Sequence, residues 1–140
     1  MMFIRVLNIV RRTKDWLNQA LRDLQHARED LRSGFYEWAC FSAQQAAEKA
    51  IKALYQALGV DVWGHSTWRL LANLPEGYRP SSDLIDLARE LDRFYMPTRY
   101  PNMHPSGAPY EYYTEKDARR AIEIAERIIQ FCRDKIEEIE

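Results

Sequence analysis

The chain has 140 residues, of which 46% are hydrophobic and 29% are charged, and its formal net charge is −1. This length and composition are typical of one globular domain with a hydrophobic core. The near-neutral charge excludes a surface coated with positive charge for non-specific nucleic-acid binding, although it allows a local basic site.

The beginning of the chain differs in character from the rest. Residues 1–13 are basic and partly apolar, and we interpret them as an N-terminal arm without an assigned function. Residues 14–140 are predicted to form one helical domain. No apolar run in the sequence approaches the length of a membrane-spanning helix, so we expect no membrane association.

Apolar residues at helical spacing predict two long helices in the first half of the chain. The first runs from about Thr13 or Lys14 to Arg32, and Ser33-Gly34 is a suitable stop. The second, from about Phe35 to Leu58, is rich in alanine, and such a surface lets neighbouring helices approach closely. A short helix from about Ser66 to Asn73 follows.

Two further helices are predicted in the second half of the chain. Ser81-Ser82-Asp83 offers an N-cap for a helix that runs to about Phe94. The segment from Thr114 to Asp117 resembles a capping box, and it opens a last helix that ends near Ile136. No alternating strand pattern is present. The predicted fold class is therefore all-α, an antiparallel bundle of four principal helices plus one short helix.

The two cysteines, Cys40 and Cys132, fall inside predicted helices at positions compatible with the core. The sequence has no Cys-x-x-Cys pair and no cysteine–histidine cluster at metal-ligand spacing. We interpret the cysteines as buried, reduced thiols of a cytoplasmic protein, although a disulfide between them is an alternative.

The segment from Met96 to Thr114 contains four prolines, at positions 97, 101, 105 and 109, so a helix cannot run through it. A connection of this length is usually functional or disordered. The prolines lower the entropy lost on ordering, and nearby tyrosines give the segment something to pack with. We predict an ordered functional loop with five tyrosines in or beside it: Tyr95, Tyr100, Tyr110, Tyr112 and Tyr113.

The same loop contains Arg99 and His104, separated by four residues. Ribonucleic acid can be cleaved without a metal when a base takes the proton of the 2′-hydroxyl and a cation stabilises the charge on phosphorus. Histidine and arginine suit these two roles. An alternative is that Arg99 pairs with an acidic residue such as Asp92 and that His104 is an ordinary loop residue. The tyrosines could stack on bases or pin the loop onto the bundle.

Other polar residues are weaker candidates. His65 could bind a phosphate or have only a structural role, and His26 is expected to be solvated on its helix. Glu48, Lys49 and Lys52 form either a polar outer face of the second helix or the lining of a site. Three histidines without an acidic cluster at ligand spacing predict no metal site. No motif for nucleotide hydrolysis or metalloprotease chemistry is present, and we expect no cofactor.

Four segments in this order give the chain a family resemblance. They are WLNQALRDLQHAREDLRSGFYEWACFSAQQAAEKAIKAL, then His65, then LDRFYMPTRYPN, then YTEKDARRAIEIAERII. From about Asp15 to Arg133, the chain resembles the HEPN family, the "higher eukaryotes and prokaryotes nucleotide-binding" domain. The resemblance implies a helical bundle that forms homodimers. It also implies a partner, a separate minimal nucleotidyltransferase encoded nearby, in some cases as a toxin–antitoxin pair.

The resemblance also suggests roles for the loop residues. Some members of the family are metal-independent ribonucleases with an Arg-x4-6-His motif, and Arg99 to His104 satisfies this spacing. By analogy, Arg99 would hold the scissile phosphate and His104 would act as acid or base. Tyr100 follows the arginine, where ribonuclease members usually carry a small polar residue. We assign nucleotide or RNA binding to Arg99, Tyr100, Asn102 and His65.

Three functions follow from the sequence. The preferred one is a nucleotide- or RNA-interacting HEPN subunit that acts as a cytoplasmic homodimer with a separate minimal nucleotidyltransferase, in a toxin–antitoxin-like pair. The alternative is a metal-independent endoribonuclease that uses Arg99 and His104. A third is a non-catalytic protein-interaction module whose proline-rich loop is the docking surface.

Overall fold

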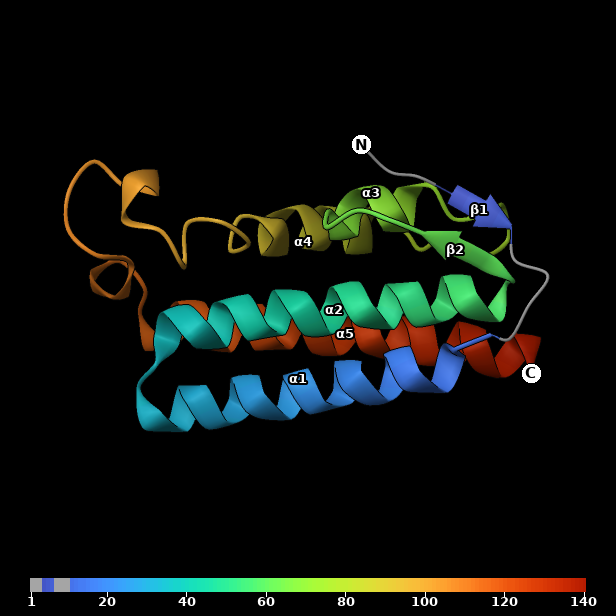
Figure 1. Cartoon of the computed structure of the whole chain (residues 1–140), viewed down its shortest axis with the longest axis horizontal. Helices are drawn as coiled ribbons and strands as arrows, with labels where there is room; N and C mark the ends of the chain where they lie inside the picture. The colour runs from blue at the N-terminus through green and yellow to red at the C-terminus, as the bar shows by residue number, and fades with distance from the viewer. Residues whose placement is uncertain (1–3, 7–10) are drawn as a thin grey trace.

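The computed structural model describes residues 4–6 and 11–140 (Figure 1). The elements of this part are, in chain order, β1 (Ile4–Val6), α1 (Thr13–Ser33), α2 (Tyr36–Ala57), β2 (Val60–Val62), α3 (Thr67–Ala72), α4 (Ser82–Asp92), the 3-10 turns η1 (Pro101–Met103) and η2 (Pro109–Glu111), and α5 (Glu115–Ile139). The predicted bundle of four principal helices and one short helix is confirmed. None of the described helices is long and apolar enough to cross a membrane.

Helix α2 lies at the centre of the bundle. It contacts α1 and α5 on one side and α3 and α4 on the other, and α1 and α4 run opposite to α2 (Figure 1). These close approaches are allowed by small side chains that are completely buried along α2, as predicted from its composition: Ala39, Ala43, Ala46, Ala47, Ala50 and Ala53.

The prediction that the chain contains no strand is wrong. Strands β1 and β2 form a two-stranded antiparallel sheet in which Ile4 pairs with Val62 and Val6 with Val60. Each strand has only three residues, which is too short for a recognisable alternating pattern. The pairing attaches residues 4–6 of the N-terminal arm to the segment that follows α2. The division into an arm and a domain stays a prediction.

Local signals in the sequence placed most helix ends correctly. Gly34 ends α1 with a φ of 82°, a left-handed conformation that glycine adopts without strain. Ser81 caps α4 by accepting a hydrogen bond from the backbone N–H of Leu84. Thr114 and Asp117 form the predicted capping box at the start of α5, each side chain accepting from the other's backbone N–H.

Both cysteines are buried and free, as we predicted. Burial disfavours the charged thiolate, because charge is poorly solvated in the protein interior. It raises the pKa of Cys40 to about 12 and also raises the pKa of Cys132. Thiols with so little thiolate at neutral pH do not act as nucleophiles, so the cysteines contribute to packing and not to chemistry.

A carboxylate near the end of α1 is mostly buried without enough hydrogen bonds to offset the loss of its solvation. The Asp30 side chain is only 15% exposed, and its Oδ2 lies 3.4 Å from His26 Nε2 but has no hydrogen-bond partner. Burial is the main cause that raises the pKa of Asp30, and the charge of His26 opposes it. The His26 side chain is largely exposed, as expected, and its Nδ1 lies 3.3 Å from Ser42 Oγ.

We predict that Asp30→Asn stabilises the protein at pH 7 by about 1 kcal/mol. A carboxyl whose pKa is raised by folding binds its proton more tightly in the folded state, so stability falls as the pH rises through that pKa. Asparagine does not ionise, and the advantage of the variant should therefore disappear on acidification to about pH 3. Urea unfolding at the two pH values measures this, with the exposed Asp134→Asn as the control. A variant less stable than wild type at pH 7 would contradict it.

Candidate functional site

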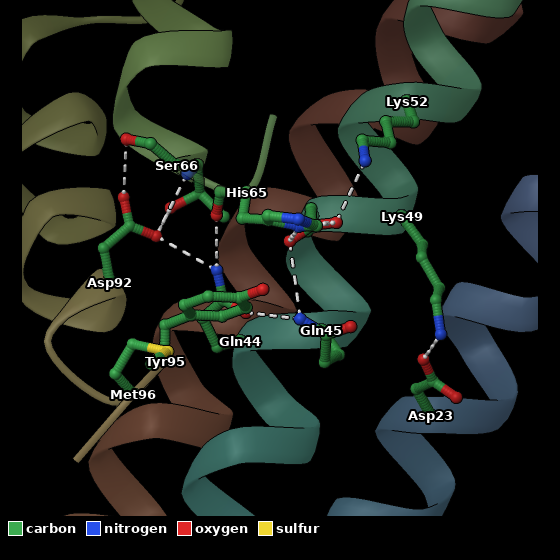
Figure 2. A network of polar contacts seen from close by, with 12 residues as sticks. Asp23, Gln44, Gln45, Lys49, Lys52, His65, Ser66, Asp92, Tyr95 and Met96 are labelled. Atoms are coloured by element: carbon green, nitrogen blue, oxygen red, sulfur yellow. Dashed lines mark hydrogen bonds and ion pairs between the residues drawn. The ribbon is translucent and has the colours of Figure 1, made fainter. Parts of the chain in front are cut away.

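Every fourth residue along one side of α2 is polar and buried. These residues are Gln44, Glu48, Lys52 and Gln56, and residues four apart lie on the same face of a helix. The face looks toward the segment between β2 and α3 and toward the end of α4 (Figures 1 and 2). The interpretation of Glu48 and Lys52 as a polar outer face is therefore wrong, because both side chains are buried. Lys49 lies apart from them and pairs with Asp23 of α1 at 2.5 Å.

Glu48 joins three side chains in this buried face. Its carboxylate accepts a hydrogen bond from Lys52 Nζ at 3.0 Å and a longer one from Gln45 Nε2 at 3.4 Å. His65 Nδ1 lies 3.3 Å from both carboxylate oxygens. A carboxylate only accepts hydrogen bonds, so Nδ1 must carry the proton. In the neutral ring, Nε2 is then the acceptor, on a side chain that is 60% exposed.

Asp92, the last residue of α4, organises the start of α3. Its Oδ1 accepts from the backbone N–H and the hydroxyl of Thr67, at 3.0 and 2.7 Å, and from Gln44 Nε2 at 3.2 Å. Its Oδ2 accepts from Ser66 Oγ at 3.1 Å and from the backbone N–H of Trp68 at 3.2 Å. Five donors therefore converge on this carboxylate, and Figure 2 shows those of Ser66 and Gln44. The alternative pairing of Arg99 with Asp92 is wrong, because none of these donors belongs to Arg99.

Arg99 is held by a backbone carbonyl and by aromatic rings. Its Nε and Nη2 donate to the carbonyl oxygen of Tyr95 at 3.0 and 2.8 Å. Its guanidinium carbon lies 4.1 Å from the ring centre of Phe41, 4.9 Å from that of Tyr95 and 5.1 Å from that of Tyr100. These are cation–π distances. The contacts fix the position of the guanidinium and leave Nη1 without a partner in the described part of the chain.

Tyr95 connects Arg99 to His65. The Tyr95 and His65 rings stack with centroids 5.0 Å apart and an interplanar angle of 17°. Beside them lies a pocket of about 360 Å³, which is within the usual range for small-molecule sites. Its lining comes from α3, the residues before it, and the end of α4: Gly64, His65, Ser66, Arg69, Leu70, Asp92 and Tyr95.

His104 lies in a second aromatic group within the proline-rich loop. Its ring stacks on Tyr112 at 4.1 Å and meets the Tyr113 ring edge-on at 6.0 Å. Its Nε2 lies 2.6 Å from the carbonyl oxygen of Pro97. A carbonyl can only accept, so Nε2 carries the proton and Nδ1 is the acceptor of the neutral ring. The predicted ordered loop is confirmed by these contacts and by η1 and η2.

The structure therefore brings together only some of the predicted site residues. Arg99 and His65 contact the same ring, that of Tyr95, and Tyr100 packs beside Arg99. Among the contacts of residues 11–140, none joins His104 to Arg99. Asn102 is exposed in η1.

Sequence reasoning missed Gln44 and Arg69 and gave Asp92 the wrong role. The spacing of four between Gln44, Glu48, Lys52 and Gln56 is visible in the sequence, and it could have indicated a buried polar face. Nothing in the sequence identified Arg69 as a pocket residue. Among the described residues there is no group of three or more histidine, cysteine or acidic side chains that could hold a metal ion.

The helical bundle matches the folds of known proteins. The HEPN domain family matches residues 13–135, and the chain belongs to this family. A solved structure from Thermus thermophilus, that of the protein TT1696, is 47% identical, covers 90% of this chain and 99% of its own, and has a TM-score of 0.87. ST0689, described as an archaeal HEPN homologue, is 45% identical with a TM-score of 0.77 and covers 91% of this chain and 99% of its own.

Two more distant relatives extend the comparison. A HEPN domain protein from Thermotoga maritima, tm0613, is 42% identical, covers 86% of this chain and 95% of its own, and has a TM-score of 0.70. A protein of Methanocaldococcus jannaschii named "Putative toxin MJ1304" is 24% identical over an alignment of 138 residues, and the match covers 92% of this chain and 91% of the relative.

We predict that Asp92→Ala lowers the free energy of unfolding by about 2–4 kcal/mol, because it leaves the backbone N–H groups of Thr67 and Trp68 without their acceptor. Asp86→Ala on the same helix removes an exposed carboxylate paired with Arg89 and should cost less than about 1 kcal/mol. Urea unfolding of the two variants makes the comparison. Equal losses would contradict the central role of Asp92.

Proposed function

We propose that this HEPN protein is a nucleotide- or RNA-interacting subunit that works with a separate minimal nucleotidyltransferase in a toxin–antitoxin-like pair. The observation that carries the proposal is the arrangement around Tyr95. An arginine lies against this ring, a histidine stacks on it, and an open pocket lies beside them. Arginine suits phosphate recognition, and aromatic rings suit stacking on bases.

The toxin-like role is supported by the relative named "Putative toxin MJ1304", which matches over nearly its whole length. The partner and the pairing are part of the proposal and follow from the resemblance of the chain to HEPN proteins. The proposal also includes a cytoplasmic location, which is consistent with two free, buried cysteines.

We further propose that the protein acts as a homodimer. Large hydrophobic side chains are exposed at the start of α2 and in the proline-rich loop, and exposed apolar groups of this kind are often covered by a partner. They include Phe35, Trp38, Met96, Tyr100 and Met103. A second copy that covers them would place its own loop next to this one.

A metal-independent endoribonuclease is the second candidate, and the orientation of His104 favours it. Because Nε2 donates to the Pro97 carbonyl, Nδ1 keeps the lone pair that a general base needs. Arg99 still has Nη1 for a phosphate. The two side chains do not contact each other in the described part of the chain, and this candidate function includes the loops of two copies coming together in the homodimer.

If the preferred function is correct, Arg99→Lys should weaken binding of nucleoside monophosphates or short single-stranded RNA about tenfold. Lysine lacks the planar fork that donates to the Tyr95 carbonyl and packs against Phe41. Isothermal titration calorimetry measures the change, and Arg133→Lys on the exposed side of α5 is the matched control. Unchanged affinity in Arg99→Lys would exclude Arg99 from the binding site.

We expect that the purified dimer without its partner does not cleave labelled single-stranded RNA in excess EDTA. The comparison includes His104→Ala and, as a control for loss of another histidine, His26→Ala. Thermal unfolding should accompany it, because His104 stacks on Tyr112. Cleavage by wild type that persists in His26→Ala and disappears in folded His104→Ala would instead establish the ribonuclease.

A further inference from the structure

We propose that the pocket beside His65 is a nucleobase site, in which His65 Nε2 accepts a hydrogen bond from an N–H group on the edge of the base. This inference rests on the proposed nucleotide- or RNA-interacting function. It adds that the pocket holds the base of the nucleotide and that one tautomer of His65 recognises this base.

The proton arrangement of His65 follows from its buried neighbour. Glu48 is almost completely buried, and its carboxylate is held in place by the hydrogen bond that it accepts from Lys52 Nζ. His65 Nδ1 lies 3.3 Å from each oxygen of this carboxylate. In the neutral imidazole, Nδ1 therefore carries the proton and Nε2 is the acceptor, as a carboxylate fixes the tautomer of a histidine in other sites.

Two other polar side chains of the pocket, those of Ser66 and Asp92, are already occupied. The two oxygens of Asp92 accept hydrogen bonds from residues of α2 and α3 and from the hydroxyl of Ser66, which is thereby occupied as a donor (Figure 2). His65 Nε2, the guanidinium of Arg69 and the hydroxyl of Tyr95 are the side-chain groups of the lining that can meet a ligand. Arg69 lies over the Trp68 ring at 4.8 Å, and its donors can contact a phosphate.

The remaining walls suit a flat, partly apolar ligand. The stacked rings of His65 and Tyr95 and the side chain of Leu70 line the pocket, and its volume of about 360 Å³ is in the range that holds a molecule as small as one nucleotide. A base that stacks here can offer an N–H group to Nε2 while its phosphate approaches Arg69. A free nucleotide and a nucleotide within single-stranded RNA present the same edge of the base. A comparison of the binding of AMP with that of a short oligoadenylate distinguishes these two ligands.

The first test is the tautomer of His65, read by long-range ¹H–¹⁵N correlation at about pH 8. We expect the Nδ1–H form in wild type and in the control Glu137→Gln, which changes an exposed carboxylate of α5. In Glu48→Gln, Lys52 keeps the amide oxygen as its acceptor, so the amide N–H₂ faces His65 and the Nε2–H form should appear. An Nε2–H tautomer in wild type would overturn the inference, whether or not Glu48→Gln folds.

The second test compares AMP with purine riboside 5′-monophosphate, whose base has no N–H group on its edge. Wild type and Glu137→Gln should bind AMP about tenfold more tightly, the effect of one hydrogen bond. Glu48→Gln should lose this preference, because a protonated Nε2 can donate to ring nitrogens that both bases share. Equal affinity of wild type for the two nucleotides would overturn the nucleobase site at His65 but not the proposed nucleotide- or RNA-interacting function. Failure of both nucleotides and of oligoadenylate to bind would overturn the proposed function as well.

Discussion

The structure depends on the need to satisfy polar groups on the buried side of α2. This helix is in contact with every other α-helix of residues 11–140, and a charged or amide side chain in such a place is costly unless it has partners. Gln44, Glu48 and Lys52 find them in each other, in His65 and in Asp92. The same hydrogen bonds therefore hold α3 and α4 against the central helix and fix the geometry of the pocket.

The polar groups that stabilise the bundle are different from the polar groups that are available to a ligand. Asp92 is saturated by five donors, so it can position α3 but has little capacity to bind anything else. Glu48 is buried, yet its effect reaches the surface through His65, whose ring is mostly exposed. A buried carboxylate can thus determine the chemistry of an exposed nitrogen without contacting the ligand.

The sequence predicted the fold well because the relevant signals are local. Helical periodicity, Gly34, Ser81 and the Thr114–Asp117 capping box each depend on residues within a few positions of one another. The pairing of β1 with β2 and the convergence of donors on Asp92 depend on residues far apart in the chain. Such contacts leave no periodic pattern, and they explain why the strands and the pocket around Arg69 were not predicted.

The candidate residues illustrate the same distinction. Spacing in the sequence grouped Arg99 with His104, because both lie in one proline-rich loop. Folding instead brings Arg99 to the ring of Tyr95, against which His65 stacks, while His104 packs on Tyr112. Within one chain, the arginine therefore adjoins the His65 pocket more directly than it adjoins the second half of its own motif. Among the described residues no contact joins Arg99 to His104, whereas the contacts that shape the His65 pocket are all made within a single chain.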